Sequence, residues 1–455
     1  MNTMFVRSSV ILLLLQALAW QAAAGADAKA FLDLAEDAGR WIASTAVASE
    51  HGSIWPDDAL APEAVGYDLA SGVAGKVVFF VALHRATGNG DYLDEARRGA
   101  DFLAATLTNP ATFDSNPRRA SLYTGIAGIG VALLHISAES PDEKYDAALQ
   151  RANQLLSDWL VRDADGVHWS DKFNDLLYGD AGTVLYLAHL AQRQENPQPW
   201  NLARLGAHSL LKQSIKDGDT RHWLFRRDKP FNLPNFSHGT AGIAYVLATV
   251  SGVTGDDMYS DAAAAGFRYL RSIAEIEDGR LLMPYGWGSD NWQGLYEFGW
   301  AHGLVGAAMT LLRLQQLDID ADEAKELLQL ARHTLASIDL PGTPAEPFAE
   351  PSTPLDFRFG RASVLSLACH WAARFPEDLE VQRLCVDLYE HIAAVAVREN
   401  DTAHWPVDAP AFMGGGRAAY TGLFHGAAGI GLALLSAHAD LTGRPRYDDL
   451  PDDPR

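Results

Sequence analysis

The sequence predicts an all-α protein, an α/α toroid in which seven helical hairpins form an inner and an outer ring of seven helices each. Three observations lead to this fold class: a glycine motif that repeats along the chain, an apolar run after each copy, and an amphipathic segment between successive copies. A pattern that recurs at a near-regular spacing is typical of one supersecondary unit used many times.

The repeated motif is Gly-x-x-Gly. Complete copies begin at Gly72, Gly125, Gly179, Gly239, Gly303 and Gly426. A degenerate copy with Gly360 and Ser363 fills the one gap, so that successive first glycines lie 53, 54, 60, 64, 57 and 66 residues apart. Because glycine has no side chain, glycines in the first turn of each inner helix allow crowded helices to approach closely.

The segments between these motifs predict the two rings. The residues after each motif are almost all apolar, as in 126–136 and 243–250. A helix that is apolar on every side is buried on every side, so these runs predict the inner helices. Amphipathic segments with charged faces predict the outer helices over 28–49, 91–107, 144–162, 200–216, 258–277, 321–338 and 379–398.

The loops that connect the rings differ in length. Turns from an inner helix to the next outer helix are short, whereas the loops that lead back are long and rich in tryptophan. All the long loops are therefore expected on one face, at the N-termini of the inner helices, and functional residues tend to lie on such loops. Helix N-termini carry a partial positive charge, so this mouth is expected to favour an anionic group.

The N-terminal residues predict export. Residues 1–26 are typical of a signal peptide, with Arg7, an apolar stretch over 10–19 and small residues over 22–26. We therefore expect a single toroid domain over 27–455 in a periplasmic or secreted protein that does not enter the membrane after cleavage. An uncleaved membrane anchor is the alternative for the first 26 residues.

The net charge argues against some classes of binding partner, and the cysteine content raises the question of a disulfide. The net charge of −22 argues against nucleic acid and anionic membrane surfaces as partners, and we expect a monomer. The two cysteines, Cys369 on the sixth predicted inner helix and Cys385 on the next outer helix, lie at similar distances from the turn between them. A disulfide in an oxidising compartment and two small core side chains both remain open.

Three of the glycine motifs resemble those of a known family. The blocks over 237–243, 299–303 and 424–430 are similar to the signature blocks of lanthionine synthetase C-like proteins. The resemblance extends through the repeats over nearly the whole chain after residue 26. It implies a toroid of seven helical hairpins and, for the family's enzymes, cyclisation of dehydrated peptides by addition of cysteine thiols to dehydroamino acids.

The resemblance also implies a zinc site, which this sequence lacks. In the family two cysteines and one histidine hold zinc, and Ala301 and Phe424 stand at the two cysteine positions here. Only His425 remains, and zinc sites need three or four protein ligands. We therefore predict neither a metal nor another cofactor.

The candidate catalytic residues are Asp175, His238, His302 and His425. The resemblance places Asp175 at the acidic position of the family, and His238 at the histidine proposed there for acid–base work. The three histidines each directly precede a motif glycine, and imidazoles with an ordinary pKa of about 6.5 can serve as acids or bases at neutral pH. The alternative is that they only cap or pack the helix starts.

Aromatic side chains around the last of these loops suggest a binding surface. The candidate substrate-binding residues are Tyr178, Trp287, Trp292, Glu297 and Trp300. Such aromatic side chains can form a platform for sugar rings or peptide side chains, and they can equally fill gaps between long loops. Glu297 stands where the lanthipeptide enzymes carry a basic residue, which reverses the charge at that position.

These observations favour an exported lanthionine synthetase C-like protein that binds a peptide or a small anionic ligand in the toroid mouth. If it is an enzyme, the expected reaction is acid–base modification of a peptide without zinc. One alternative is a carbohydrate-active toroid enzyme, for which Asp175 and Glu297 would supply the two carboxylates of a glycosidase. Another alternative is a binding module without catalytic activity.

Overall fold

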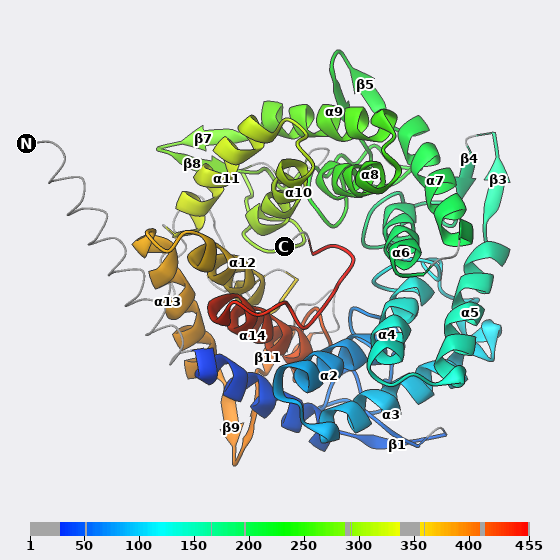
Figure 1. The fold of residues 1–455 in the computed structure, drawn as a ribbon, viewed down its shortest axis with the longest axis vertical. Helices are drawn as coiled ribbons and strands as arrows, with labels where there is room; N and C mark the ends of the chain where they lie inside the picture. The colour runs from blue at the N-terminus through cyan, green and yellow to red at the C-terminus, as the bar shows by residue number, and fades with distance from the viewer. Residues whose placement is uncertain are drawn as a thin grey trace, which may run out of the picture.

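The structure, a computed structural model, describes residues 28–50, 52–164, 166–194, 197–286, 292, 294–336, 355–358, 360–409 and 415–453. The predicted signal peptide over 1–26 lies outside these residues and stays a prediction. The described helices form a closed ring with one layer of helices inside another (Figure 1). The predicted α/α toroid is therefore confirmed.

The inner ring consists of the apolar helices that follow the glycine motifs. They are α2 (Val73–Thr87), α4 (Ile126–Glu139), α6 (Asp180–Arg193), α8 (Thr240–Thr254), α10 (Leu304–Gln316), α12 (Arg361–Arg374) and α14 (Ala427–Thr442). Each packs against the next along the chain, and α14 packs against α2, which closes the ring. Nearly every side chain of these helices is buried, as their all-round apolar sequences predict.

The outer ring consists of amphipathic helices that each pack against the inner helix of their hairpin. They are the helical residues 28–44, α3 (Gly90–Leu107), α5 (Glu143–Asp158), α7 (Pro197–Lys212), α9 (Asp257–Ile273), α11 (Ala321–Ala336) and α13 (Leu379–Val395). The first and last outer helices meet where the ring closes: the rings of Phe31 and Tyr389 stack with centroids 4.2 Å apart, and Arg398 pairs with Asp37 at 3.0 Å.

Short β-hairpins correct the all-helical expectation at the ends of the outer helices. Glu275–Glu277, predicted as helix, is strand β7 and pairs with β8 (Arg280–Leu282) across a turn in which Asp278 and Gly279 have φ of 49° and 78°. Asp-Gly at the two central positions favours such a turn, and this local signal overrides the helical pattern. Several of these hairpins project outward from the ring (Figure 1).

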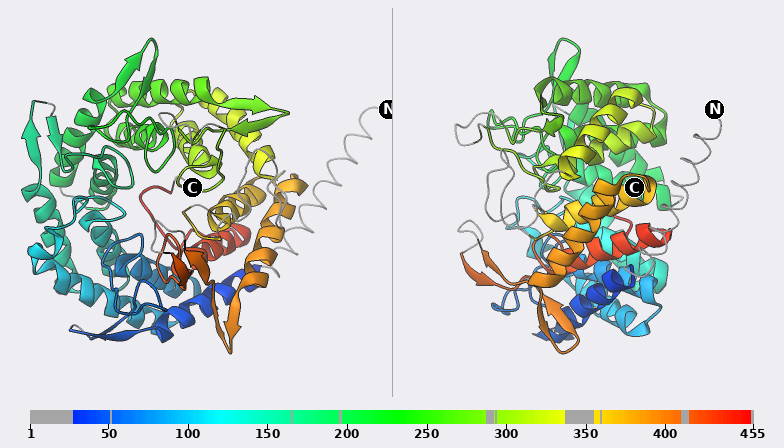
Figure 2. Two further views of the ribbon diagram at one scale, coloured as in Figure 1. Left: turned by 180° about the vertical axis from the view of Figure 1, so that it is seen from behind. Right: turned by 90° about the vertical axis from the view of Figure 1, so that its left-hand side faces the viewer.

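The remaining strands also form two-stranded antiparallel pairs. They are β1 (Val47–Ser49) with β2 (Gly52–Ile54), β3 (Val161–Asp163) with β4 (Gly166–His168), β5 (Ile215–Asp217) with β6 (Thr220–His222), β9 (Val397–Glu399) with β10 (Thr402–His404), and β11 (Val407–Ala409) with β12 (Gly416–Ala418). A 3-10 turn, η1, covers Pro110–Phe113. In the side view, β11 and β12 project from one face of the ring (Figure 2).

A tryptophan after three of these hairpins ties the loop back to its outer helix. The indole Nε1 atoms of Trp169, Trp223 and Trp405 each donate to a backbone carbonyl 13 residues earlier, at 2.7, 2.7 and 2.8 Å. These carbonyls lie near the C-terminal ends of α5, α7 and α13, where backbone acceptors lack helical partners. The repeated tryptophans of the long loops therefore have a structural role.

The motif glycines are required by the loop that precedes each inner helix. A Cβ atom on Gly128 would lie 2.3 Å from the carbonyl oxygen of Leu122 and 2.7 Å from the Cβ of Leu69 in the previous repeat. On Gly239 it would lie 1.3 Å from the carbonyl oxygen of Leu233. The sequence predicts close contacts between neighbouring helices at these glycines. In the structure the close contacts are mainly between the start of a helix and the loop that precedes it.

The C-terminal segment 443–453 leaves α14 and turns back into the centre of the ring (Figure 1). The side chain of Arg446 pairs with Asp440 and Asp453 and donates to Ser366 of α12 at 3.3 Å. At the end of this segment Asp452 is 3% exposed, so a carboxyl group is buried near the axis. The C-terminal segment therefore lies in the centre of the ring.

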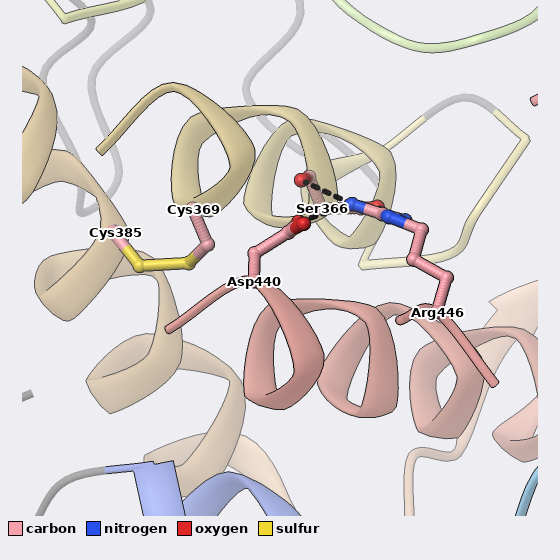
Figure 3. Close-up of a disulfide and its surroundings, with 5 residues drawn as sticks. All are labelled: Ser366, Cys369, Cys385, Asp440 and Arg446. Atoms are coloured by element: carbon pink, nitrogen blue, oxygen red, sulfur yellow. Dashed lines mark hydrogen bonds and ion pairs between the residues drawn. A yellow bond between two sulfur atoms is a disulfide. The ribbon is translucent and has the colours of Figure 1, made fainter. Parts of the chain in front are cut away.

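A disulfide joins Cys369 of α12 to Cys385 of α13 (Figure 3). Their Cα atoms are 5.2 Å apart, and both side chains are almost fully buried. Of the two alternatives that the sequence leaves open, the structure has the bridge. No described helix is both long and apolar enough to cross a bilayer.

Candidate functional site

In three successive repeats, the residues that directly precede the motif glycines lie next to one another. Each motif glycine is the N-cap of its helix, so the residue before it stands just above the helix start. The ring of Tyr178 lies 5.1 Å from that of His238, and the ring of His238 lies 5.3 Å from that of His302. Three successive repeats thus place their equivalent side chains in one row.

Asp175 and His238 form the central hydrogen-bonded pair. His238 Nδ1 lies 2.5 Å from Asp175 Oδ2, and Oδ1 of the same carboxyl accepts from the backbone N–H of Tyr178 at 2.8 Å. Asp175 is fully buried and the His238 side chain is 7% exposed. Both carboxyl oxygens are therefore bound, which fixes the orientation of the imidazole ring.

Burial and nearby cations set the protonation of this pair. Burial lowers the pKa of His238 well below its ordinary value, and the charges of Arg358 and Arg118 lower it further. Burial raises the pKa of Asp175 well above its ordinary value, while the Tyr178 N–H and the two arginines oppose that rise. The lowered pKa keeps the imidazole of His238 neutral at neutral pH, so one ring nitrogen has a lone pair that can accept a proton, and it also makes the ring a weaker base than an ordinary histidine.

Two arginines from distant loops act on this pair through their charges. The guanidinium carbon of Arg118 lies 3.7 Å from the centroid of the Tyr178 ring. That of Arg358 lies 5.6 Å from the centroid of the Phe424 ring. The charge of Arg358 lowers the pKa of His302 as well as that of His238.

His302 lies between the Asp175–His238 pair and the aromatic side chains of Tyr285 and Trp292. Glu297 Oε2 lies 3.7 Å from His302 Nδ1, and the ring of Tyr285 packs edge-on against the His302 ring with centroids 4.5 Å apart. Tyr285 in turn packs against Trp292 at 5.8 Å. Burial lowers the pKa of His302 well below its ordinary value, and the neighbouring imidazole of His238 and the charge of Arg358 lower it further.

His425 has an acidic partner of its own. Its Nδ1 lies 3.1 Å from Asp356 Oδ2, and both side chains are 12% exposed. Asp356 precedes Gly360 by four residues, as Asp175 precedes Gly179, and each aspartate contacts the histidine before the glycine of the next repeat. The toroid therefore contains the same acid–histidine pair twice.

The other predicted binding residues separate into two groups. Tyr178, Trp292 and Glu297 lie against the histidines or against Tyr285, as described above. Trp300 is 1% exposed, and its indole Nε1 donates to Asp452 Oδ2 at 3.0 Å, so it packs in the centre of the ring. Trp287 lies outside the described residues.

Comparison with known proteins assigns the family. Residues 63–344 match the family of lanthionine synthetase C-like proteins. The chain belongs to this family. No curated protein sequence is significantly similar to this lanthionine synthetase C-like protein.

Solved structures of the same general architecture are similar to this family member at low identity. Nisin cyclase matches 85% of this chain and 91% of its own, with 15% identity and a TM-score of 0.58. An α-1,6-mannanase from Salegentibacter sp. HEL1_6 covers 80% and 99%, with 16% identity and a TM-score of 0.43. An unsaturated glucuronyl hydrolase specific for heparin covers 83% and 97%, with 11% identity and a TM-score of 0.48. At 15% identity, the likeness to nisin cyclase shows the fold.

A zinc ion of the kind that the family resemblance implies does not fit these residues. Ala301 is fully buried, and Phe424 packs against Tyr123 and Trp300 with ring centroids 4.6 and 5.3 Å apart. Apolar side chains thus fill both cysteine positions, while His425 binds Asp356. Within the described ranges, no three His, Cys, Asp or Glu side chains are placed to hold a metal ion.

Sequence reasoning missed three charged residues of the site. Asp356 had a usable signal, because it has the same offset from its glycine as Asp175. Arg118 and Arg358 had none, since their positions relative to His238 depend on how loops from the second and sixth repeats fold over the mouth. A loop conformation of this kind is not encoded in helical periodicity.

Proposed function

We propose that this lanthionine synthetase C-like protein binds a peptide or a small anionic ligand in the toroid mouth and transfers a proton by acid–base chemistry without zinc. The observation that carries the proposal is the buried Asp175–His238 pair, in which the imidazole is held in one orientation and is neutral at neutral pH. The family name and the printed name of nisin cyclase point to peptides as the substrate class.

The two members of the pair have different roles in this proposal. Asp175 is fully buried with both oxygens bound, so it orients His238 rather than touching the ligand. With Nδ1 held by Asp175, the imidazole exchanges its proton at Nε2. That atom can take a proton from a thiol, the thiolate can add to the β-carbon of a dehydroamino acid, and the same proton can return to the α-carbon. The proton balance closes without any metal ion.

The second acid–histidine pair supplies a further proton donor or acceptor. His425 and Asp356 are each 12% exposed, so they are more accessible than His238 and Asp175. A base and an acid at separate positions allow a proton to leave one side of a substrate and return on another. We assign His425 this second role: it gives a proton to the substrate and regains one from solvent, while His238 releases its proton to solvent before the next turnover.

Export and a monomeric state are part of the proposal. The predicted signal peptide and the bridge between Cys369 and Cys385 both support an oxidising compartment such as the periplasm or the exterior. The strong negative net charge supports the absence of nucleic-acid partners.

Among the described residues of the site, no contact favours the glycosidase alternative. A glycosidase needs two carboxyl groups that reach the glycosidic bond, and Asp175 is buried beneath His238 and Tyr178 with both oxygens engaged. Glu297 lies against His302. A non-catalytic binding module is compatible with the same contacts and is decided by the test below.

The test is turnover of a dehydroalanine-containing peptide with a small thiol, measured by mass spectrometry in both directions and in the presence of a chelator. We expect the protein to accelerate the reaction, and His238→Gln to reduce the rate by about 10²- to 10⁴-fold, since that is the usual contribution of a general base. His208→Gln is the matched control, because His208 is an exposed residue of α7 far from the motif glycines.

Three outcomes would contradict parts of the proposal. Equal rates for the wild type and His238→Gln would reject His238 as the base. Saturable peptide binding without turnover would show a binding module. Release of reducing sugar from glycans in a parallel screen would show a carbohydrate-active enzyme.

A further inference from the structure

Arg118 has a buried N–H donor without an acceptor among the described residues. Its guanidinium group stacks on the Tyr178 ring at 3.7 Å and approaches the Phe173 ring at 5.6 Å. Its Nε atom is buried, and no described residue accepts a hydrogen bond from it. Stacking on a ring stabilises the charge but leaves the Nε–H donor without a partner, and a buried donor without a partner is costly.

The position of Arg118 connects it to the Asp175–His238 pair. Tyr178, on which it stacks, is the residue before a motif glycine and lies 5.1 Å from the ring of His238. The charge of Arg118 acts on both members of the pair, because it lowers the pKa of each. A group bound to Arg118 would therefore lie beside the base.

We propose that Arg118, held by its stacking on Tyr178, binds a carboxylate of the ligand next to His238. The planar guanidinium presents paired N–H donors that match the two oxygens of a carboxylate. This inference rests on the proposed function, because it names the chemical class of the ligand for the same site.

The charges around the mouth favour a single negative charge over a phosphate dianion. Arg118 and Arg358 contribute two positive charges near His238, and Asp175 and Glu297 contribute up to two negative ones. A monoanion adds one charge to a nearly balanced site, whereas a dianion would leave a clear excess of negative charge. Ligands that fit are small carboxylic acids and peptides with a free carboxyl group at or near the reacting residue.

The neighbouring residue provides a matched control. Arg119 also lies over an aromatic ring, with its guanidinium carbon 4.4 Å from the Trp159 centroid, but it pairs with Asp114 at 3.3 Å. Trp159 is the C-cap of outer helix α5, so Arg119 points away from the row of histidines. Arg119→Gln therefore removes the same charge and shape from the same loop without touching the site.

The experiment uses N-acetylalanine as the probe, its amide as the neutral analogue, and inorganic phosphate as the competing anion. Binding is followed by NMR shifts of the histidine and arginine side chains of the full-length mature protein. We expect the acid to bind and the amide not to bind. Arg118→Gln should weaken binding of the acid by about 10- to 100-fold, in line with loss of a charge-assisted pair, and Arg119→Gln should leave it unchanged.

Each other outcome overturns the inference. These outcomes are no binding of the acid, equal binding of acid and amide, tighter binding of phosphate than of the acid, or no effect of Arg118→Gln. Thermal unfolding shows whether Arg118→Gln is folded. If it is not, Arg118→Lys is used instead: lysine keeps the charge but lacks the paired donors, so binding of the acid should still fall measurably. Carboxylate specificity with no turnover would reject the acid–base function, while His238-dependent turnover without carboxylate specificity would reject only this inference.

Discussion

The indole Nε1 of Trp300 donates a 3.0 Å hydrogen bond to Oδ2 of Asp452, which lies 152 residues later in the chain. The hydroxyl of Tyr123 donates to the same oxygen at 2.7 Å. Trp300 precedes Ala301 and His302, so this carboxyl of the C-terminal segment supports the loop that carries a candidate histidine. Burial raises the pKa of Asp452 to about 6, and the two hydrogen bonds oppose that rise.

We predict that Asp452→Asn removes a pH dependence of stability. Since the folded pKa of Asp452 is raised, its protonated form is favoured in the folded state, and this stability is present near pH 4 and is lost as the pH rises through about 6. The loss amounts to about 3 kcal/mol at most. Asn mimics the protonated acid and still accepts both hydrogen bonds. The difference in Tm between variant and wild type should therefore grow in favour of the variant from pH 4.5 to pH 7.5, and a constant difference would contradict the assignment.

Substitution of Arg358 or of Arg118 should change the pKa values of His238 and His302 in different ways. A nearby cation disfavours the imidazolium, so removing it raises the histidine pKa. Arg358→Gln should raise the pKa of both His238 and His302, whereas Arg118→Gln should raise that of His238 and leave His302 nearly unchanged. NMR titration of the imidazole carbons measures each histidine. Equal shifts of both histidines in both variants would show that the two arginines do not occupy separate positions.

The purified protein should contain no stoichiometric zinc. Ala301 and Phe424 fill the positions of two thiolate ligands with apolar side chains, and a single histidine does not hold zinc. Elemental analysis after exhaustive dialysis should find far less than one zinc per chain. About one zinc per chain that disappears in His425→Ala would show that a zinc site exists.

Reduction of the disulfide should destabilise the protein. The bridge closes a segment of 16 residues, for which loop closure contributes about 3 kcal/mol. The Cys369→Ser/Cys385→Ser double variant should unfold at lower denaturant concentration by a corresponding amount. Thiol titration of the denatured, non-reduced wild type should detect no free thiol, and two free thiols would contradict the bridge.

Alanine at the second motif glycine should be strongly destabilising. In Gly128→Ala the new Cβ would meet the Leu122 carbonyl oxygen at 2.3 Å, so a backbone segment must move, at a cost of about 1–3 kcal/mol or more. Gly90→Ala is the control, because nothing lies within 4 Å of its Cβ position at the start of α3. The control should be neutral or slightly stabilising. Similar effects of the two substitutions would show that the motif is not set by close packing.

The two rings of helices and part of the site could be predicted from the sequence. All-round apolar runs after each motif predict buried helices such as α4 and α8, and the structure has both. Helix α4 starts at the first residue of its predicted run, and α8 starts three residues before its run. The contact between Asp175 and His238 follows from the same periodicity, because residues near equivalent glycines of successive repeats come together. The resemblance to the family identified these two residues as candidates.

The remaining features depend on interactions that the helical periodicity of the sequence does not reveal. The hairpins at the ends of the outer helices are set by local turn residues such as Asp278 and Gly279, which interrupt a helical pattern only at its last turn. The place of Arg118 depends on a loop conformation, and the burial of Asp452 depends on a segment with no repeat at all. Trp300 was assigned to ligand binding from its neighbours in sequence, but its indole turns toward Asp452 instead.

The closure of the ring between its first and last hairpins affects how the protein must fold. The side chains of Arg398 and Asp37 are 361 residues apart in sequence, and α14 covers the open side of α2. In an open array of repeats each unit folds against the one before it, so a shortened chain keeps most of its stability. Here, a growing chain cannot complete its inner ring until the final helix has been synthesised. Late closure over such a long separation is expected to be slow, and it makes the seven hairpins one cooperative unit.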